Sequence, residues 1–378
     1  MPSATSSIAT DGSSMRSQTE WVESLSPWPE EFGLGRIRAL LAELGHPQRA
    51  YRSIHVVGTN GKSTATRQVA AFLEREGLLT GAYTSPHVAG WSERIQVGRS
   101  DADLETALAR VREPAERIGA TQFEVLTAAA LAEFAAAGVD VAVVEAGLGG
   151  RLDATNVLAA PIVVLTNVAL DHADVLGATR EEIAAEKLAV VTRGATVVLG
   201  EAEWEPLARA NSATKIVVAD DVARAAAEAF LGKEVDGEVD GDAAPPGRFD
   251  VSQDEVWAGA HNPAGLEWLA RRLPAADYVL CVSILGDRDV EAMLERLASL
   301  GRGLVTTASS NPRSLSAQDL AERARTYFER VEAIPDPVAA LARARELGPP
   351  VLVTGSLYLL QDLAVRVEDV PWGSLASG

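Results

Sequence analysis

Short apolar runs and helical periodicities alternate along most of the chain. Runs rich in β-branched residues predict strands at 54–57, 78–83, 141–144, 162–165, 196–199 and 215–218. Apolar residues recur at helical spacing over 37–44, 63–76, 103–118, 123–137 and 180–191. Pro114 is expected to kink or end one of these helices. Apolar strands that alternate with helices are typical of a mostly parallel sheet covered on both faces.

The pattern stops between residues 233 and 247, a stretch rich in Gly, Pro and acids that predicts a linker with no means of packing. Beyond it the alternation resumes on a smaller scale. We expect strands near 249–257, 279–284, 303–308, 331–334 and 350–354, and helices at 263–272, 290–299, 316–328, 337–346 and 356–365. This second half lacks a G-x-G-x-x-G motif, so an independent dinucleotide site is not indicated.

The predicted organisation is therefore two α/β domains. Residues 1–19 are rich in Ser, Thr and Ala, lack the apolar core of a signal peptide, and are expected to form a disordered tail. A sheet domain with a phosphate-binding loop is expected over 20–232, followed by the linker at 233–247. A smaller Rossmann-like α/β domain is expected over 248–378.

Composition excludes several classes of protein. The chain carries 34 Lys and Arg against 53 acids, a net charge of −19, which disfavours a nucleic-acid partner. Cys281 is the single cysteine, so an internal disulfide framework is ruled out. No apolar run reaches the ~18 residues that a membrane span needs. We expect a cytoplasmic protein.

The sequence I-H-V-V-G-T-N-G-K-S-T-A, residues 54–65, has the order of a phosphate-binding loop. A strand leads into a glycine turn, and Lys62 and two hydroxyls then open a helix. The loop N–H groups and Lys62 would face the phosphates of ATP, and a hydroxyl would reach Mg²⁺. The candidate ATP-binding residues here are Gly58, Thr59, Asn60, Gly61, Lys62, Ser63 and Thr64. The alternative is an ordinary glycine turn with a surface lysine, because only two residues separate the glycines.

Polar residues follow two of the predicted strands. Glu145 comes directly after the strand at 141–144, and His172 follows the strand at 162–165. The carboxyl ends of parallel strands meet at one edge of a sheet, so both residues are expected beside the phosphate-binding loop. The alternatives are a solvated acid at a strand end and a structural histidine.

The chain resembles the folylpolyglutamate synthase and dihydrofolate synthase branch of the Mur ligase superfamily, from about residue 30 to about residue 363. The resemblance rests on H-V-V-G-T-N-G-K, Y-T-S-P-H followed by E-R-I, F-E-V-L-T, V-E-A-G-L-G-G-R-L-D-A-T-N, A-L-D-H, I-A-A-E-K, P-G-R-F, G-A-H-N-P and V-T-G-S-L-Y-L. The shortened G-T-N-G-K-[ST] loop is the Mur form. Y-T-S-P-H points away from the muramyl ligases.

The resemblance implies a Mur-type central domain and a set of site residues. It implies metal ligation by Ser85 (with Thr84 as the neighbouring candidate), Glu145, His172 and Lys187, the last as a carbamate made from CO₂. With Lys62, the last three are the implied catalytic residues. Arg248, His261 and Asn262 would reach ATP from the second domain. The pterin substrate would lie at Glu30, Glu31, Phe32, Thr121, Gln122, Phe123, Glu124, Leu152, Asp153 and Ala154. Taken alone, Lys187 would be a solvated helix charge and Arg248 a linker charge.

Three positions depart from the family's pattern. The family has Gly after the loop lysine, where this chain has Ser63, so either Ser63 or Thr64 could meet the metal. Ala258 replaces the Asp that opens D-G-A-H-N-P, and Asp221 replaces a linker Asn. Ala258 removes an acceptor that the resemblance implies for the ribose or base of the nucleotide, and the effect of these changes on nucleotide affinity is left open.

The resulting hypothesis is an ATP- and Mg²⁺-dependent ligase that joins L-glutamate to a folate-type carboxylate, dihydropteroate or a reduced folate, through an acyl phosphate. Its partners would be these small molecules, without nucleic acid or membrane, and it would be a monomer. The alternatives are a Mur-type ligase for another carboxylate, and a nucleotide-binding regulator whose ligase activity has decayed.

Overall fold

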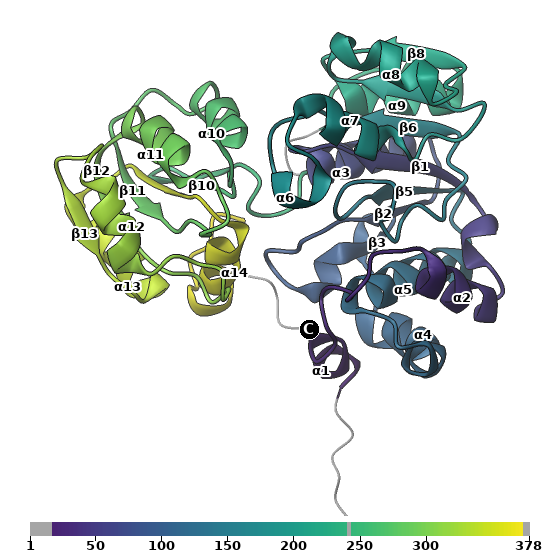
Figure 1. Cartoon of the computed structure of the whole chain (residues 1–378), viewed down its shortest axis with the longest axis horizontal. Coiled ribbons are helices and arrows are strands. Elements are labelled where there is room, and N and C mark those ends of the chain that lie inside the picture. The colour runs from purple at the N-terminus through teal and green to yellow at the C-terminus, as the bar shows by residue number, and fades with distance from the viewer. Residues whose placement is uncertain (1–16, 240–242, 373–378) are drawn as a thin grey trace, which may run out of the picture.

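A computed structural model describes residues 17–239 and 243–372, which form two sheets, each with helices on both faces (Figure 1). Most of the expected tail, residues 1–16, lies outside the described residues, as do residues 240–242 of the expected linker. Residues 17–19, the end of the expected tail, are structured, because Ser17 caps helix α1 (Gln18–Glu23) through a capping box with Glu20.

The first sheet has eight strands in the order β4-β3-β2-β5-β1-β6-β7-β8. Its strands are β1 (Arg52–Val57), β2 (Thr80–Tyr83), β3 (Ile95–Val97), β4 (Ser100–Asp101), β5 (Val141–Glu145), β6 (Ile162–Leu165), β7 (Thr196–Leu199) and β8 (Lys215–Val218). All neighbours pair in parallel except β3, which pairs antiparallel with β2 and β4. The mostly parallel sheet predicted from the apolar runs is confirmed.

Alternate residues of the central strands pack on opposite faces of this sheet. Ile54 and Val56 pack with α3 and α9, whereas Ala142 and Val144 pack with α2, α4 and α5. Helices α7 and α8 cover the same face as α5, over β6 and β7. The helices are α2 (Gly35–Glu43), α3 (Lys62–Arg75), α4 (Leu104–Ile118), α5 (Gln122–Ala137), α6 (Ala173–Leu176), α7 (Arg180–Leu188), α8 (Glu205–Ala210) and α9 (Val222–Leu231), with 3₁₀ turns at Pro47–Arg49, Trp91–Arg94 and Ala202–Trp204.

The second sheet has six strands in the order β13-β12-β11-β14-β10-β9. Its strands are β9 (Asp250–Val251), β10 (Glu255–Ala258), β11 (Tyr278–Val282), β12 (Gly301–Thr306), β13 (Val331–Ala333) and β14 (Val351–Thr354). Its helices are α10 (Pro263–Ala270), α11 (Val290–Ala298), α12 (Ala317–Ala324), α13 (Pro337–Leu347) and α14 (Leu357–Arg366). The expected strand at 249–257 is wrong in one respect, because β9 and β10 form an antiparallel pair.

Two further expectations are corrected by the structure. Helix α4 continues through Pro114 to Ile118, so of the two expected effects of this proline, a kink or an end, the end is wrong. The expected linker does pack in its described part: Val235 is buried against the α3 and α9 face, and Arg224 donates to its carbonyl. The long arginine side chains of α3 and α9 hold this stretch, which its composition did not indicate. None of the helices over 17–239 and 243–372 is long and apolar enough to cross a membrane.

Candidate active site

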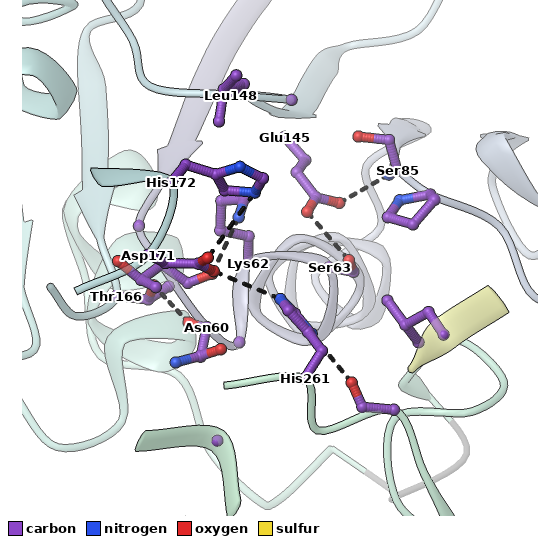
Figure 2. Close-up of a pocket in the computed structure, with 18 of the residues that line it drawn as sticks. Asn60, Lys62, Ser63, Ser85, Glu145, Leu148, Thr166, Asp171, His172 and His261 are labelled. Atoms are coloured by element: carbon purple, nitrogen blue, oxygen red, sulfur yellow. Dashed lines mark hydrogen bonds and ion pairs between the residues drawn. The ribbon is translucent and has the colours of Figure 1, made fainter. Parts of the chain in front are cut away.

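The site lies where β1, β5 and β6 end, between the first sheet and the second domain. It is a cavity of about 1710 Å³ lined by both domains, and Lys62, Glu145, His172 and Lys187 all line it. Arg248 and His261 line it from the second domain. Figure 2 shows Lys62 and Glu145 beside the N-terminal end of α3, with His261 approaching from the other side. The structure therefore brings the predicted catalytic residues together.

The phosphate-binding loop is held in place by the end of the neighbouring strand β6. Gly58 has φ +151°, and a Cβ there would lie 1.9 Å from Thr166 Oγ1, so only glycine fits. Thr166 Oγ1 and Asn167 Nδ2 donate to the carbonyl of Asn60, at 2.7 and 3.0 Å. Lys62 Nζ donates to the carbonyl of Thr59 at 3.2 Å. This ordered loop and its opening into α3 contradict the alternative of a simple turn.

Glu145 is a buried carboxylate, only 1% exposed, so the solvated-acid alternative is wrong. Its Oε1 accepts from Ser63 Oγ at 3.0 Å and its Oε2 from the Ser85 N–H at 2.9 Å. Burial raises the pKa of Glu145, and the charges of Lys62 and Arg248 oppose that shift. Its carboxylate oxygens are of the type that a hard metal ion takes as ligands.

Lys187 is also buried, at 4% exposure, which contradicts its interpretation as a solvated helix charge. Its Nζ donates to the carbonyl of Gly58 at 2.8 Å, so the lysine of α7 reaches the phosphate-binding loop. Burial and then the nearby charge of Lys62 lower the pKa of Lys187 to about 7. A sizeable share of this amine is therefore neutral at physiological pH.

His172 and Asp171 form a contact region with the second domain. His172 has φ +51° and stands at the N-terminus of α6. Its Nε2 lies 3.3 Å from Arg288 Nη2, and burial lowers its pKa to about 4. Asp171 forms an ion pair with Arg288 and accepts from Asn262 Nδ2 at 3.1 Å, while His261 Nε2 lies 3.5 Å away. Figure 2 shows the approach of His261 to Asp171.

Asp171 and Arg288 were not among the predicted site residues. Asp171 stands inside the A-L-D-H motif, directly before His172, and that position was the one available signal. No signal in the sequence pointed to Arg288, because its partners Asp171 and His172 belong to the other domain.

Arg248 points into the site, so its interpretation as a linker charge is wrong. Its Nη2 donates to Ser63 Oγ and to the carbonyl of Pro86, both at 3.0 Å. Asn262 caps α10 by accepting from the Gly265 N–H at 2.8 Å and is 2% exposed. Of the three residues predicted from the second domain, Arg248 and His261 line the cavity, whereas Asn262 does not line it and contacts the phosphate-binding loop at Asn60.

Most of the predicted substrate residues line the same cavity, namely Phe32, Thr121, Gln122, Phe123, Glu124, Leu152, Asp153 and Ala154. Glu30 and Glu31 do not line it, since the chain turns there toward Arg36, which donates to the Glu31 carbonyl. Trp28, which was not predicted, lines it instead, 6.2 Å from Phe32 between ring centroids. Both rings are about half exposed, as a face for a flat aromatic ligand would be.

Two of these residues carry structural bonds. Glu124 pairs with Arg36 at 3.0 Å and forms a capping box with Thr121. Asp153 accepts from the N–H groups of Leu148 and Thr155, which fixes the loop after β5. They shape the cavity through these contacts.

The structure shows where the three residues lie that depart from the family's sequence pattern, Ser63, Ala258 and Asp221. Ser63 bridges Glu145 and Arg248, whereas Thr64 is half-buried and lines the cavity. Ala258 is buried at the end of β10, and Asp221 caps α9 through the Arg224 N–H at 3.0 Å. Ala258 and Asp221 both line the cavity as well.

Comparison with known proteins places both domains. Residues 56–218 match the Mur ligase middle domain, and residues 247–357 match the Mur ligase glutamate ligase domain. A dihydrofolate synthase/folylpolyglutamate synthase of Mycobacterium tuberculosis is 33% identical, covering 80% of this chain and 80% of that protein. The folylpolyglutamate synthase of Lacticaseibacillus casei is 31% identical, covering 90% of this chain and 96% of that protein.

Solved structures agree with this assignment. The Mycobacterium tuberculosis folylpolyglutamate synthase complexed with ADP is 30% identical with a TM-score of 0.83, covering 93% of this chain and 98% of that one. The bifunctional folylpolyglutamate synthase/dihydrofolate synthase of Yersinia pestis complexed with AMPPNP and Mn ion is 27% identical with a TM-score of 0.81, covering 93% of this chain and 98% of that one. On this evidence the chain belongs to the dihydrofolate synthase/folylpolyglutamate synthase family of the Mur ligases.

Proposed function

We propose that this protein joins L-glutamate to a folate-type carboxylate, dihydropteroate or a reduced folate, and releases ADP and phosphate. As a member of its family it is an ATP-dependent ligase that uses a divalent metal ion. The observation that carries the proposal is the meeting of Lys62 and Glu145 with Arg248 and His261 in one cavity, which is also lined by the aromatic pair Trp28 and Phe32.

Amide formation from a carboxylate needs an activated acid. The carboxylate oxygen attacks the γ-phosphorus of ATP, ADP leaves, and the amine of glutamate then attacks the carbonyl carbon and expels phosphate. Two anions must first approach each other, so the site has to offset their repulsion. Lys62 and Arg248 bring fixed positive charge to the loop, and the first N–H groups of α3 add their dipoles.

The donor set fits Mg²⁺. The buried Glu145 carboxylate and the Ser85 hydroxyl offer the hard oxygen ligands that Mg²⁺ takes, and over the described residues no three His, Cys, Asp or Glu side chains gather into a metal-binding group. Glu145, His172, the Ser85 hydroxyl and a carbamate on Lys187 would hold the ion. Once bound, Mg²⁺ would supply positive charge to the transferring phosphoryl group.

The proposal is tested by measuring phosphate release with ATP and Mg²⁺ plus dihydropteroate, glutamate, both or neither. Release that requires both substrates, with a product heavier than the acid by one glutamate residue, supports the proposal. A further arm replaces dihydropteroate with a cell-wall precursor acid. Phosphate release with that acid and not with dihydropteroate would indicate a different Mur-type ligase. No release with any acceptor would indicate a nucleotide-binding regulator.

A further inference from the structure

The Ser63 hydroxyl stands between opposite charges that come from the two domains. Its Oγ donates to Glu145 Oε1 at 3.0 Å and accepts from Arg248 Nη2 at 3.0 Å. A hydroxyl has one proton and two lone pairs, so donation to the carboxylate leaves its lone pairs for the guanidinium. The residue is 5% exposed, and water therefore competes little for these bonds.

The remaining contacts close a ring of bonds around this hydroxyl. Arg248 Nη2 also donates to the Pro86 carbonyl at 3.0 Å, and the Ser85 N–H donates to Glu145 Oε2 at 2.9 Å. Among the ion pairs of residues 17–239 and 243–372, none joins Glu145 directly to Arg248. Ser63 is therefore the bridge between them, and Figure 2 shows its bond to Glu145 at the start of α3.

The second terminal nitrogen of the Arg248 guanidinium, Nη1, is available for a hydrogen bond to a ligand. Arg248 Nη1 is buried and has no partner among the described residues, a costly state for an N–H donor. The Arg248 side chain lines the same cavity as Lys62. An anion placed at the loop would supply the acceptor that Nη1 lacks.

We propose that Ser63 is a positioning residue that holds Arg248 beside the phosphate-binding loop before nucleotide arrives, so that Nη1 meets the terminal phosphate of ATP. A side chain already fixed in its bound pose loses little freedom when the ligand binds, and affinity gains accordingly. The kinetic part of this inference rests on the proposed ligase reaction, whereas its binding part does not.

Removing the hydroxyl should release Arg248 and weaken binding of a nucleoside triphosphate. The lost bond is one to a charged group, so the dissociation constant of AMPPNP should rise about tenfold in Ser63→Ala. Ser63→Gly should give the same rise, because both variants lack the hydroxyl. The KM for ATP should rise by a similar factor while kcat changes less.

A double-mutant cycle on AMPPNP affinity, measured by titration calorimetry, tests the proposal. Ser63→Ala, Arg248→Ala and the double variant are compared, and the double variant should bind no more weakly than Arg248→Ala alone. Thr66→Val is the matched control, since it removes a buried hydroxyl of the same helix that has no partner in the described chain. Its affinity should equal that of the wild type.

Strictly additive losses, or a Ser63→Ala affinity equal to that of the control, would overturn the proposal. Circular-dichroism melts of each variant separate misfolding from loss of the bridge. The cycle needs neither glutamate nor folate, so it gives a result even where the wild type shows no glutamate-dependent turnover.

Discussion

Asn60 of the phosphate-binding loop and Asn262 of the second domain exchange two side-chain hydrogen bonds. Asn60 Nδ2 donates to Asn262 Oδ1 at 3.2 Å, and Asn262 Nδ2 donates to Asn60 Oδ1 at 3.0 Å. Asn262 Oδ1 also accepts from the Gly265 N–H and so caps α10. One side chain thus both starts a helix of the second domain and contacts the ATP-binding loop of the first.

These two roles of Asn262 can be separated by substitution. Asn262→Ser keeps a capping oxygen but loses the bonds of the amide to Asn60 and Asp171, so the KM for ATP should rise several-fold while the cap of α10 remains. Asn262→Ala should lose the cap as well, about 1 kcal/mol of stability. Thermal melts and ATP titrations of the two variants check this. Equal melting temperatures for the two would show that the cap contributes nothing.

Lys62→Ala should abolish turnover, by about 1000-fold or more, and leave the fold intact. The lysine bonds only to the carbonyl of Thr59 among the described residues, so its loss removes little folding free energy. Lys215→Ala is the control, because Lys215 is an exposed lysine of β8. Phosphate release and a circular-dichroism melt are the measurements. A Lys62→Ala variant with nearly the full rate would mean that the loop assignment is wrong.

Lys187 should act as a carbamate. Its amine, with a pKa lowered to about 7, is partly neutral and able to react with CO₂, which would turn it into an anionic oxygen ligand. Arg cannot form this group, so Lys187→Arg should fold and be nearly inactive. Lys187→Ala should be inactive but partly rescued by millimolar acetate or formate. The activity of each variant, with and without added carboxylate, is the readout.

Removing CO₂ from the wild-type enzyme at mildly acidic pH should lower activity, and bicarbonate should restore it. Normal activity of Lys187→Arg, or a free amine by mass spectrometry with no bicarbonate effect, would contradict the carbamate. The metal site would then consist of Glu145, His172 and the Ser85 hydroxyl.

His55 should make the fold less stable in acid. It is buried in β1, 2.8 Å from Thr155 Oγ1, and burial lowers its pKa from 6.5 to about 4. Between these values the unfolded chain binds a proton that the folded chain does not, so stability falls as pH falls from 6.5 to about 4. His55→Gln removes this titration and should flatten the decline. Denaturant melts across that range test it, and equal slopes for both proteins would exclude His55 as a cause.

The sequence predicted the buried strands well, because a strand that is covered on both faces can be recognised from its own residues. Residues 162–165 and 196–199 are continuous apolar runs, which a strand covered on both faces requires, and they match β6 and β7. Helix α9 was missed, although its apolar residues do gather on one buried face. The packing of residues 233–239 was missed because it depends on specific contacts, from Arg75 of the distant helix α3 and from Arg224 of the preceding helix α9.

The site was predictable where a motif fixes one strand end, as at Glu145. It was not predictable where two domains meet. The ion pair of Asp171 with Arg288 joins residues far apart in the sequence, and the bridging role of Ser63 depends on how Arg248 enters. Neither pattern nor composition carries that information.

The central claim, that this chain makes an amide by phosphorylating a folate-type carboxylate, is tested most directly with dihydropteroate labelled with ¹⁸O in its carboxyl group. The labelled oxygen that attacks the γ-phosphorus leaves with phosphate when glutamate displaces it. We expect ligated product and released phosphate carrying one ¹⁸O each, seen by mass spectrometry. Ligated product with unlabelled phosphate, label in AMP, or no ligated product would contradict the claim.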